Sequence, residues 1–144
     1  MKLEKCLQIG IVVPDIDEAV VSYEKYGITS WQKREFSSQR FGMTVCGATD
    51  SLEFKSAVCE HSGFEIELIQ PVSEGTFMDW LRKHGPSLHH ISLQPNEGYQ
   101  AFMKEFTDAG SRVDTEVLSP DGTRGFAYLD TVAQLGFYTE ILKR

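Results

Sequence analysis

An internal repeat constrains the fold of this chain more than any other feature of its sequence. In the first half, an apolar strand pattern at residues 7–13 is followed by a break at Pro14 and by apolar residues at helical spacing that end at Gly27. In the second half, a strand pattern that begins at His90 is followed by the same helical spacing, which ends at Gly110. The copies are offset by about 83 positions. The sequence therefore predicts two copies of one strand–helix unit.

The ends of the two halves also match. Residues 63–68 and residues 136–141 share the pattern Gly-Phe-x-x-Glu-aliphatic, which predicts a similar closing strand in each half. Further strands are predicted at residues 30–36, 41–48, 52–59, 112–118 and 125–129. A helix is predicted at residues 76–84, with Thr76 as its N-cap and Gly85 near its end.

Together these elements predict the α+β class, in the form of two paired βαβββ modules that enclose a barrel-like cleft. The modules span residues 1–71 and 87–144, the helix at residues 76–84 links them, and residues 1–144 form a single domain. A chain of 144 residues is long enough to bury a hydrophobic core. Because ligand sites commonly lie in the mouths of barrels, we expect the functional residues on the inner walls of the cleft.

The composition excludes several classes of protein. The longest apolar run, residues 9–13, is far too short to span a membrane, and no signal-peptide pattern is present, so we expect a cytoplasmic protein without a membrane partner. A net charge of -7 without a lysine or arginine run argues against a nucleic-acid partner. The three cysteines Cys6, Cys46 and Cys59 lack CxxC spacing, which predicts free thiols.

The repeat also selects candidate functional residues. It places Gln8 at the position of His90 in the opening strands, and Glu67 at the position of Glu140 in the closing strands. Buried carboxylates without partners are costly, so two that converge with an imidazole and an amide indicate a bound cation. Three oxygens and one nitrogen suit manganese, cobalt, nickel or magnesium, and zinc is also compatible. The alternative is that Gln8 and the two glutamates lie on the solvent face of their strands.

Three segments resemble a known family. Residues 8–17 (QIGIVVPDID), 66–71 (IELIQP) and 85–92 (GPSLHHIS) are similar to the vicinal oxygen chelate superfamily of glyoxalases, bleomycin resistance proteins and dioxygenases. Within it they are closest to the methylmalonyl-CoA epimerase and glyoxalase-like branch. The resemblance implies a glyoxalase-like fold, one divalent metal ion in the cleft, reactions through a metal-stabilised enolate or an oxygen chelate, and a homodimer. By motif position, it assigns the metal ligands to Gln8, Glu67, His90 and Glu140.

Two features depart from the family pattern. Gln8 stands where these enzymes usually carry a histidine, and an amide oxygen is a poorer ligand, so we expect weak metal binding, a harder ion or loss of the metal. An epimerase also needs two acid–base groups on opposite faces of the substrate carbon. Glu140 can be one, and Glu35 is the other if its strand is shifted by several residues. The alternative for Glu35 is an exposed strand charge. His89, next to His90, is expected to point outward or to support the site.

The leading functional prediction is a metal-dependent isomerase, epimerase or lyase. Its substrate is a small enolisable acid, carbonyl compound or thioester, and a glutamate moves the proton. The alternative is a non-catalytic protein of the same fold that binds a small molecule, of the antibiotic-sequestering type, for which Gln8 is the best evidence. An oxygen-activating dioxygenase is disfavoured, because such iron sites use two histidines and the four positions offer one.

Overall fold

The computed structural model describes residues 1–144 and confirms the α+β class. The elements along the chain are β1 (Leu3–Val12), α1 (Ile16–Glu24), β2 (Gln32–Ser37), β3 (Thr44–Cys46), β4 (Glu53–His61), β5 (Phe64–Pro71), α2 (Thr76–His84), β6 (Ser87–Pro95), α3 (Tyr99–Asp108), β7 (Val113–Leu118), β8 (Gly125–Leu129), α4 (Val132–Leu135) and β9 (Tyr138–Lys143). The short helix α4 is not predicted by the sequence pattern. None of the helices combines the length and the apolar character that a membrane span requires.

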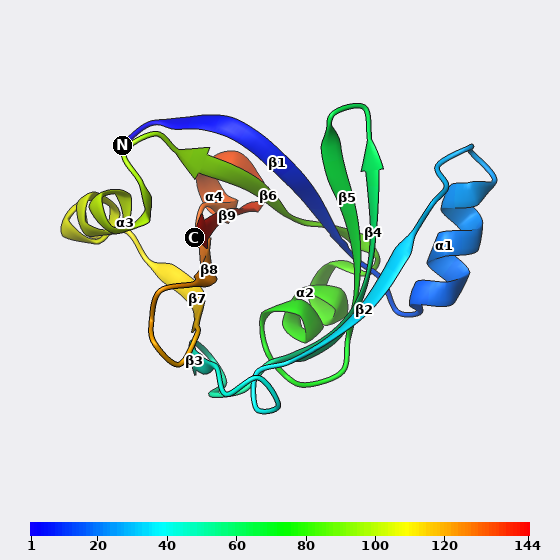
Figure 1. Ribbon diagram of the computed structural model, residues 1–144, viewed down its shortest axis with the longest axis horizontal. Coiled ribbons are helices and arrows are strands. Elements are labelled where there is room, and N and C mark those ends of the chain that lie inside the picture. The colour runs from blue at the N-terminus through cyan, green and yellow to red at the C-terminus, as the bar shows by residue number, and fades with distance from the viewer.

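All strands belong to one sheet, in the order β2-β4-β5-β1-β6-β9-β8-β7-β3. β5 lies parallel to β1, and β9 lies parallel to β6 in the same way. β1 and β6 pair antiparallel and join the two halves of the sheet. Figure 1 shows that the sheet curls into a half-barrel, with β2, β4 and β5 on one side and β7, β8 and β9 on the other.

β3 comes from the first half of the chain but pairs with the second. Val45 lies opposite Val117 of β7, at the far edge of the sheet. The sequence pattern predicts a longer strand at residues 41–48, yet only Thr44–Cys46 is paired. The chain ahead of β3 turns instead, since the amide of Phe41 donates to the carbonyl of Ser37. The segment between β2 and β3 therefore runs from one edge of the half-barrel to the other.

The helices α1 and α3 cover the outer face of the sheet. Both carry the predicted apolar spacing, which buries one stripe of each helix. The first outer core holds Ile16, Val20, Ala57, Ile66 and Leu68. The second outer core holds Phe102, Phe106, Ala127, Leu129 and Ile141. The outer face is thus closed by apolar packing in each half.

α2 instead fills one end of the concave face. Its residues Phe77 and Trp80 pack with Val12 of β1 and Tyr128 of β8 in the largest core cluster. Gln8 lies on the same face of β1 as Val12, since the two are four residues apart. The end of the concave face around Gln8 is therefore the part that α2 leaves open.

The starts of α1 and α2 are built differently. The carboxylate of Asp15 accepts hydrogen bonds from the amides of Asp17 and Glu18 and so caps α1, as the position of an aspartate just before a run of helical spacing indicates. The prediction of Thr76 as the cap of α2 is wrong, because Gly75 occupies the N-cap position and no side chain caps the helix. The Thr76 hydroxyl lies 3.0 Å from His89 Nε2 instead.

Candidate active and metal-binding site

Strand pairing brings the candidate residues onto one face of the sheet. Gln8 of β1 lies opposite Ser92 of β6, and Ser92 lies beside Glu140 of β9. Gly10, two residues further along β1, lies opposite His90. Residues two apart on a strand share a face, so Gln8, His90 and Glu140 all project to the concave side.

β5 adds two carboxylates to the same face. Its parallel register places Glu65 beside Gln8 and Glu67 beside Gly10. Gln8 Nε2 donates a hydrogen bond to Glu65 Oε1 at 3.1 Å. The four residues that the sequence selects as ligands thus lie on the adjacent strands β5, β1, β6 and β9 and face the same way.

A cavity of about 180 Å³ opens on this face. Gln8, Glu67 and Glu140 line it together with Glu65, Ser92, Phe54, Phe126 and Tyr128. Carboxylates from both halves of the chain therefore share one small space with aromatic rings. Such a mixture of apolar walls and a few convergent polar groups is typical of a small-molecule site.

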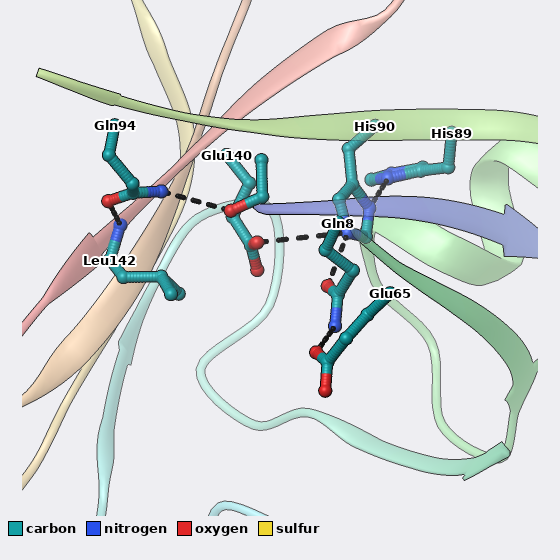
Figure 2. Close-up of polar contacts among 8 residues, drawn as sticks. Gln8, Glu65, His89, His90, Gln94, Glu140 and Leu142 are labelled. Carbon is teal, nitrogen blue, oxygen red and sulfur yellow. Dashed lines mark hydrogen bonds and ion pairs between the residues drawn. The ribbon is translucent and has the colours of Figure 1, made fainter. Parts of the chain in front are cut away.

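His90 connects the two halves of the site. Its Nε2 lies 3.5 Å from Gln8 Oε1 and 3.9 Å from Glu140 Oε2. Dashed lines mark these two contacts in Figure 2. The His90 side chain is fully buried, and Glu140 is 5% exposed. Glu140 Oε2 is buried without any hydrogen-bond partner. A buried carboxylate oxygen of this kind is costly, so a cation or a hydrogen-bond donor at this atom would be stabilising.

Burial raises the pKa values of the two central carboxyl groups. The pKa of Glu67 rises to about 8, because of burial first and then of the nearby charges of Glu140 and Glu65. The pKa of Glu140 rises to about 7, mainly through burial, against the opposing effect of the Ser92 and Tyr128 hydroxyls. Both carboxyl groups therefore titrate near neutral pH.

A β-bulge places both histidines inside the cleft. Leu88 pairs with Ile11 and His90 pairs with Gly10, so His89 is an extra residue in β6. Its side chain is fully buried, and His89 Nδ1 lies 3.0 Å from His90 Nδ1. Strand alternation predicts an outward His89, but the bulge turns its side chain inward. The contact with His90 agrees with the alternative prediction that His89 supports the site.

Both imidazoles are neutral at physiological pH. Burial lowers the pKa of His90 to about 3. The pKa of His89 is also lowered, by burial first and then by His90. A neutral imidazole has a free ring nitrogen, which is the form that binds metal ions.

The donor set fits a divalent ion in part. Two atoms bound about 2.1 Å from one ion lie roughly 3–4.2 Å apart, and both distances from His90 Nε2 fall in that range. The unpartnered oxygen of Glu140 is a second suitable donor. Glu67, however, does not join His90 and Glu140 in a cluster of three His, Cys, Asp or Glu side chains that could hold a metal ion. Gln8, His90 and Glu140 thus form a partial donor set, with Glu67 in the same cavity wall.

Glu35 is not brought to this site. It lies on β2 next to Phe36, whose ring packs against the largest core cluster. Neighbouring residues on a strand face opposite ways, so the Glu35 side chain points away from that cluster. It is exposed and lines surface hollows at the edge of the sheet rather than the cavity with Glu140. This position matches the alternative interpretation of Glu35 as an exposed strand charge.

Glu65 is a site residue that the sequence analysis does not select. It lines the cavity and binds the amide of Gln8. The repeat could not identify it, because its counterpart in the second half is Tyr138. Its spacing of two residues from Glu67 was the available signal, since that spacing puts both carboxylates on one strand face.

The chain belongs to the Glyoxalase/Bleomycin resistance protein/Dioxygenase superfamily, whose family model matches residues 7–128. The match confirms the resemblance carried by the segments around Gln8, Glu67 and His90. The curled sheet and its helices agree with the glyoxalase-like fold of this superfamily. No curated protein sequence matches the chain.

Methylmalonyl-CoA epimerases are among the solved structures that the chain resembles. A variant of the Streptomyces coelicolor enzyme in complex with 2-nitronate-propionyl-CoA aligns with a TM-score of 0.67 and 21% identity, over 98% of this chain and 94% of that chain. A methylmalonyl-CoA epimerase in complex with methylmalonyl-CoA and NH4+ gives the same four values. The Mycobacterium tuberculosis enzyme aligns with a TM-score of 0.61 and 17% identity, over 97% and 87%. At these identities, the likeness shows the shared fold.

Proposed function

We propose that this protein is an isomerase or epimerase that removes a proton from a carbon atom next to a carbonyl group and returns it. The observation that carries the proposal is the pair Glu67 and Glu140. They come from different halves of the chain, line one cavity, and have pKa values raised to about 8 and about 7. The substrate class is a small enolisable acid, carbonyl compound or thioester, and a lyase reaction would begin with the same proton removal.

The two carboxyl groups supply the proton chemistry. General acid–base catalysis is most effective when the pKa of the group lies near the working pH, because both protonation states are then populated. Glu67 on β5 and Glu140 on β9 flank β1 and β6, so a substrate between them meets a carboxyl group from each side. One group takes the proton and the other returns it on the opposite face of the carbon atom. The Tyr128 ring and the Phe126 ring form part of the wall of this space.

We also propose that Gln8, Glu67, His90 and Glu140 hold one divalent ion, namely manganese, cobalt, nickel, zinc or magnesium. The chemistry that such an ion supplies when bound is polarisation of a carbonyl or carboxylate oxygen, which lowers the pKa of the adjacent C–H group. Glu67 and Glu140 each have two carboxyl oxygens, so each can bind the ion through one and exchange a proton with the substrate through the other. The unpartnered Glu140 Oε2 and its distance of 3.9 Å from His90 Nε2 support this site.

The complexes of similar structures bear on the substrate class. One similar epimerase is described with methylmalonyl-CoA, and another with a nitronate analogue of propionyl-CoA. Both ligands are thioesters or analogues with a carbon acid beside a carbonyl group. We therefore place acyl-CoA thioesters first among the substrates to be tested here.

The first experiment is elemental analysis of the untagged protein, purified without chelator, together with the variants His90→Ala and Glu140→Ala. We expect about one equivalent of a transition metal in the native protein and its loss in both variants. Unchanged metal content in a variant that carries both substitutions would refute the proposed ligands. A matched control is Glu35→Ala, because Glu35 lies outside the cavity.

The second experiment measures exchange of the substrate proton in D₂O by NMR, with methylmalonyl-CoA and other enolisable thioesters and acids. We expect exchange that is lost in chelator and restored by one particular divalent ion. Glu140→Gln and Glu67→Gln should each slow exchange by about 10²- to 10⁴-fold. Glu35→Gln tests the prediction that Glu35 is the second acid–base group, and an unchanged rate would rule out that role.

A second candidate function is a non-catalytic protein that binds a small molecule in the same cavity. It is favoured by Gln8, an amide where the family carries histidine, and by the incomplete metal cluster. In this case the protein would bind its ligand equally well in chelator, and no substrate proton would exchange. Ligand binding in the presence and absence of chelator therefore separates the two functions.

Assembly and location complete the proposal. We propose a homodimer, which light scattering at several protein concentrations would test. The cytoplasm is the location that the composition predicts, and cell fractionation would test it. The net charge of -7 gives no support to a nucleic-acid partner, and the only partner in the proposed reaction is the small-molecule substrate.

A further inference from the structure

A single chain of hydrogen bonds runs through the buried part of the site. Thr76 Oγ1 lies 3.0 Å from His89 Nε2, and His89 Nδ1 lies 3.0 Å from His90 Nδ1. His90 Nε2 lies 3.5 Å from Gln8 Oε1, and Gln8 Nε2 lies 3.1 Å from Glu65 Oε1. Figure 2 shows the part of this chain from His89 to Glu65. Five side chains from α2, β6, β1 and β5 are thus linked end to end.

The carboxylate at the end of the chain sets the direction of its hydrogen bonds. A carboxylate can only accept, so the amide nitrogen of Gln8 faces Glu65 and the amide oxygen faces His90. The amide oxygen of Gln8 can only accept, so its contact with the buried His90 Nε2 requires the hydrogen on Nε2. His90 Nε2 therefore carries the hydrogen in the metal-free protein.

The direction then passes to the second histidine. A neutral imidazole has one N–H, so His90 Nδ1 is bare and accepts a hydrogen bond from His89 Nδ1. His89 Nε2 is bare in turn and accepts from the Thr76 hydroxyl. We infer that the chain from Thr76 to Glu65 fixes one tautomer of each histidine in the metal-free protein, and that binding of a divalent ion reverses both tautomers.

The reversal follows from what a metal ligand needs. A cation bound at His90 Nε2 requires the lone pair there, so the hydrogen must be on His90 Nδ1. His90 then donates to His89 Nδ1, and His89 Nε2–H donates to Thr76. A hydroxyl can donate or accept, which allows Thr76 to end the chain in either direction. His89 is thus a positioning residue that supports His90 as a ligand, and this second half of the inference rests on the proposed metal site.

The metal-free half is tested by long-range ¹H–¹⁵N NMR of the native protein labelled at histidine, in chelator. We expect the hydrogen on Nε2 of His90 and on Nδ1 of His89. The opposite tautomers would overturn the inference. Thr76→Val removes the hydroxyl donor with little change of shape and should leave a mixture of tautomers, whereas Thr115→Val, at another buried threonine, should leave both unchanged.

The metal-bound half is tested by adding Zn²⁺ to the same sample and by measuring its affinity calorimetrically. We expect both tautomers to reverse, and His89→Phe to weaken Zn²⁺ binding by about 10- to 100-fold, the usual effect of removing a partner of a ligating histidine. His84→Phe is the control, since His84 stacks on the same Trp80 but does not contact His90. Zinc binding without reversal would overturn this half. Absence of zinc binding would overturn the metal-bound half of the inference together with the proposed metal site. The metal-free half is judged separately, by the tautomers observed in chelator.

Discussion

The imidazole of His90 lies directly over Gly10. The two residues face each other across β1 and β6, and a Cβ atom on Gly10 would lie 2.0 Å from Cε1 and 2.3 Å from Nε2 of the ring. Gly10 is not among the glycines with positive φ, so its backbone does not require glycine. The missing side chain is needed because the histidine ring occupies that space.

Gly10→Ala should therefore displace the His90 ring. Overpacking of this kind typically costs about 1–3 kcal/mol of unfolding free energy, and the metal affinity should fall with it. Urea denaturation of the metal-free protein measures the first effect. In a His90→Ala background the same change should cost much less, because the clash is gone. Equal costs in both backgrounds would show that the clash lies elsewhere.

The raised pKa values of Glu67 and Glu140 predict how stability depends on pH. Between their ordinary value of 4.5 and their folded values of about 8 and about 7, the folded state binds more protons than the unfolded state. The free energy of unfolding must therefore fall as pH rises through this window, by on the order of a few kcal/mol, and level off above it.

The free energy of unfolding is measured by urea denaturation of chelator-treated protein at several pH values from roughly 5 to 9, the window in which the two groups titrate. Glu67→Gln should flatten the dependence, because the amide does not titrate. Glu35→Gln is the control, since Glu35 is exposed and outside the cavity. A native protein whose stability rises with pH in this range would contradict the raised pKa values.

Arg144 is predicted to tune the acid–base group from the rim of the cavity. It lines the cavity, and its positive charge lowers the pKa of Glu140 against the larger effect of burial. Arg144→Gln should therefore raise the pKa of Glu140 further in the metal-free protein, which a ¹³C NMR titration of labelled glutamate can follow. Lys143→Gln, at the neighbouring position over the Tyr99 ring, should have a smaller effect. A lower pKa of Glu140 in the Arg144 variant would be inconsistent with this role.

The cap of α1 gives a prediction that is independent of the site. Asp15 accepts two backbone hydrogen bonds at the start of the helix. Asp15→Ala should lower the free energy of unfolding by about 0.5–2 kcal/mol, and Asp15→Asn by less, because asparagine also caps helices. Metal content should not change in either variant. Equal losses in the two variants would indicate that the cap itself is not the cause.

Much of the candidate site follows from local sequence pattern. The repeat equates Gln8 with His90 and Glu67 with Glu140, and strand alternation then puts all four on equivalent faces. Because both properties depend only on spacing along the chain, they can be inferred without coordinates. The α+β class and the cap at Asp15 were predictable for the same reason.

Tertiary structure alone decided the remaining features. Pairing of β3 with β7 joins residues distant in sequence, and no local pattern encodes it. The bulge that turns His89 inward depends on the register between β6 and β1. Thr76 was predictable as a helix start, but its contact with His89 arises only because α2 packs inside the curled sheet. The sequence thus determined which residues share a strand face, since that is set by a local period, whereas the packing of strands and helices decided which atoms meet.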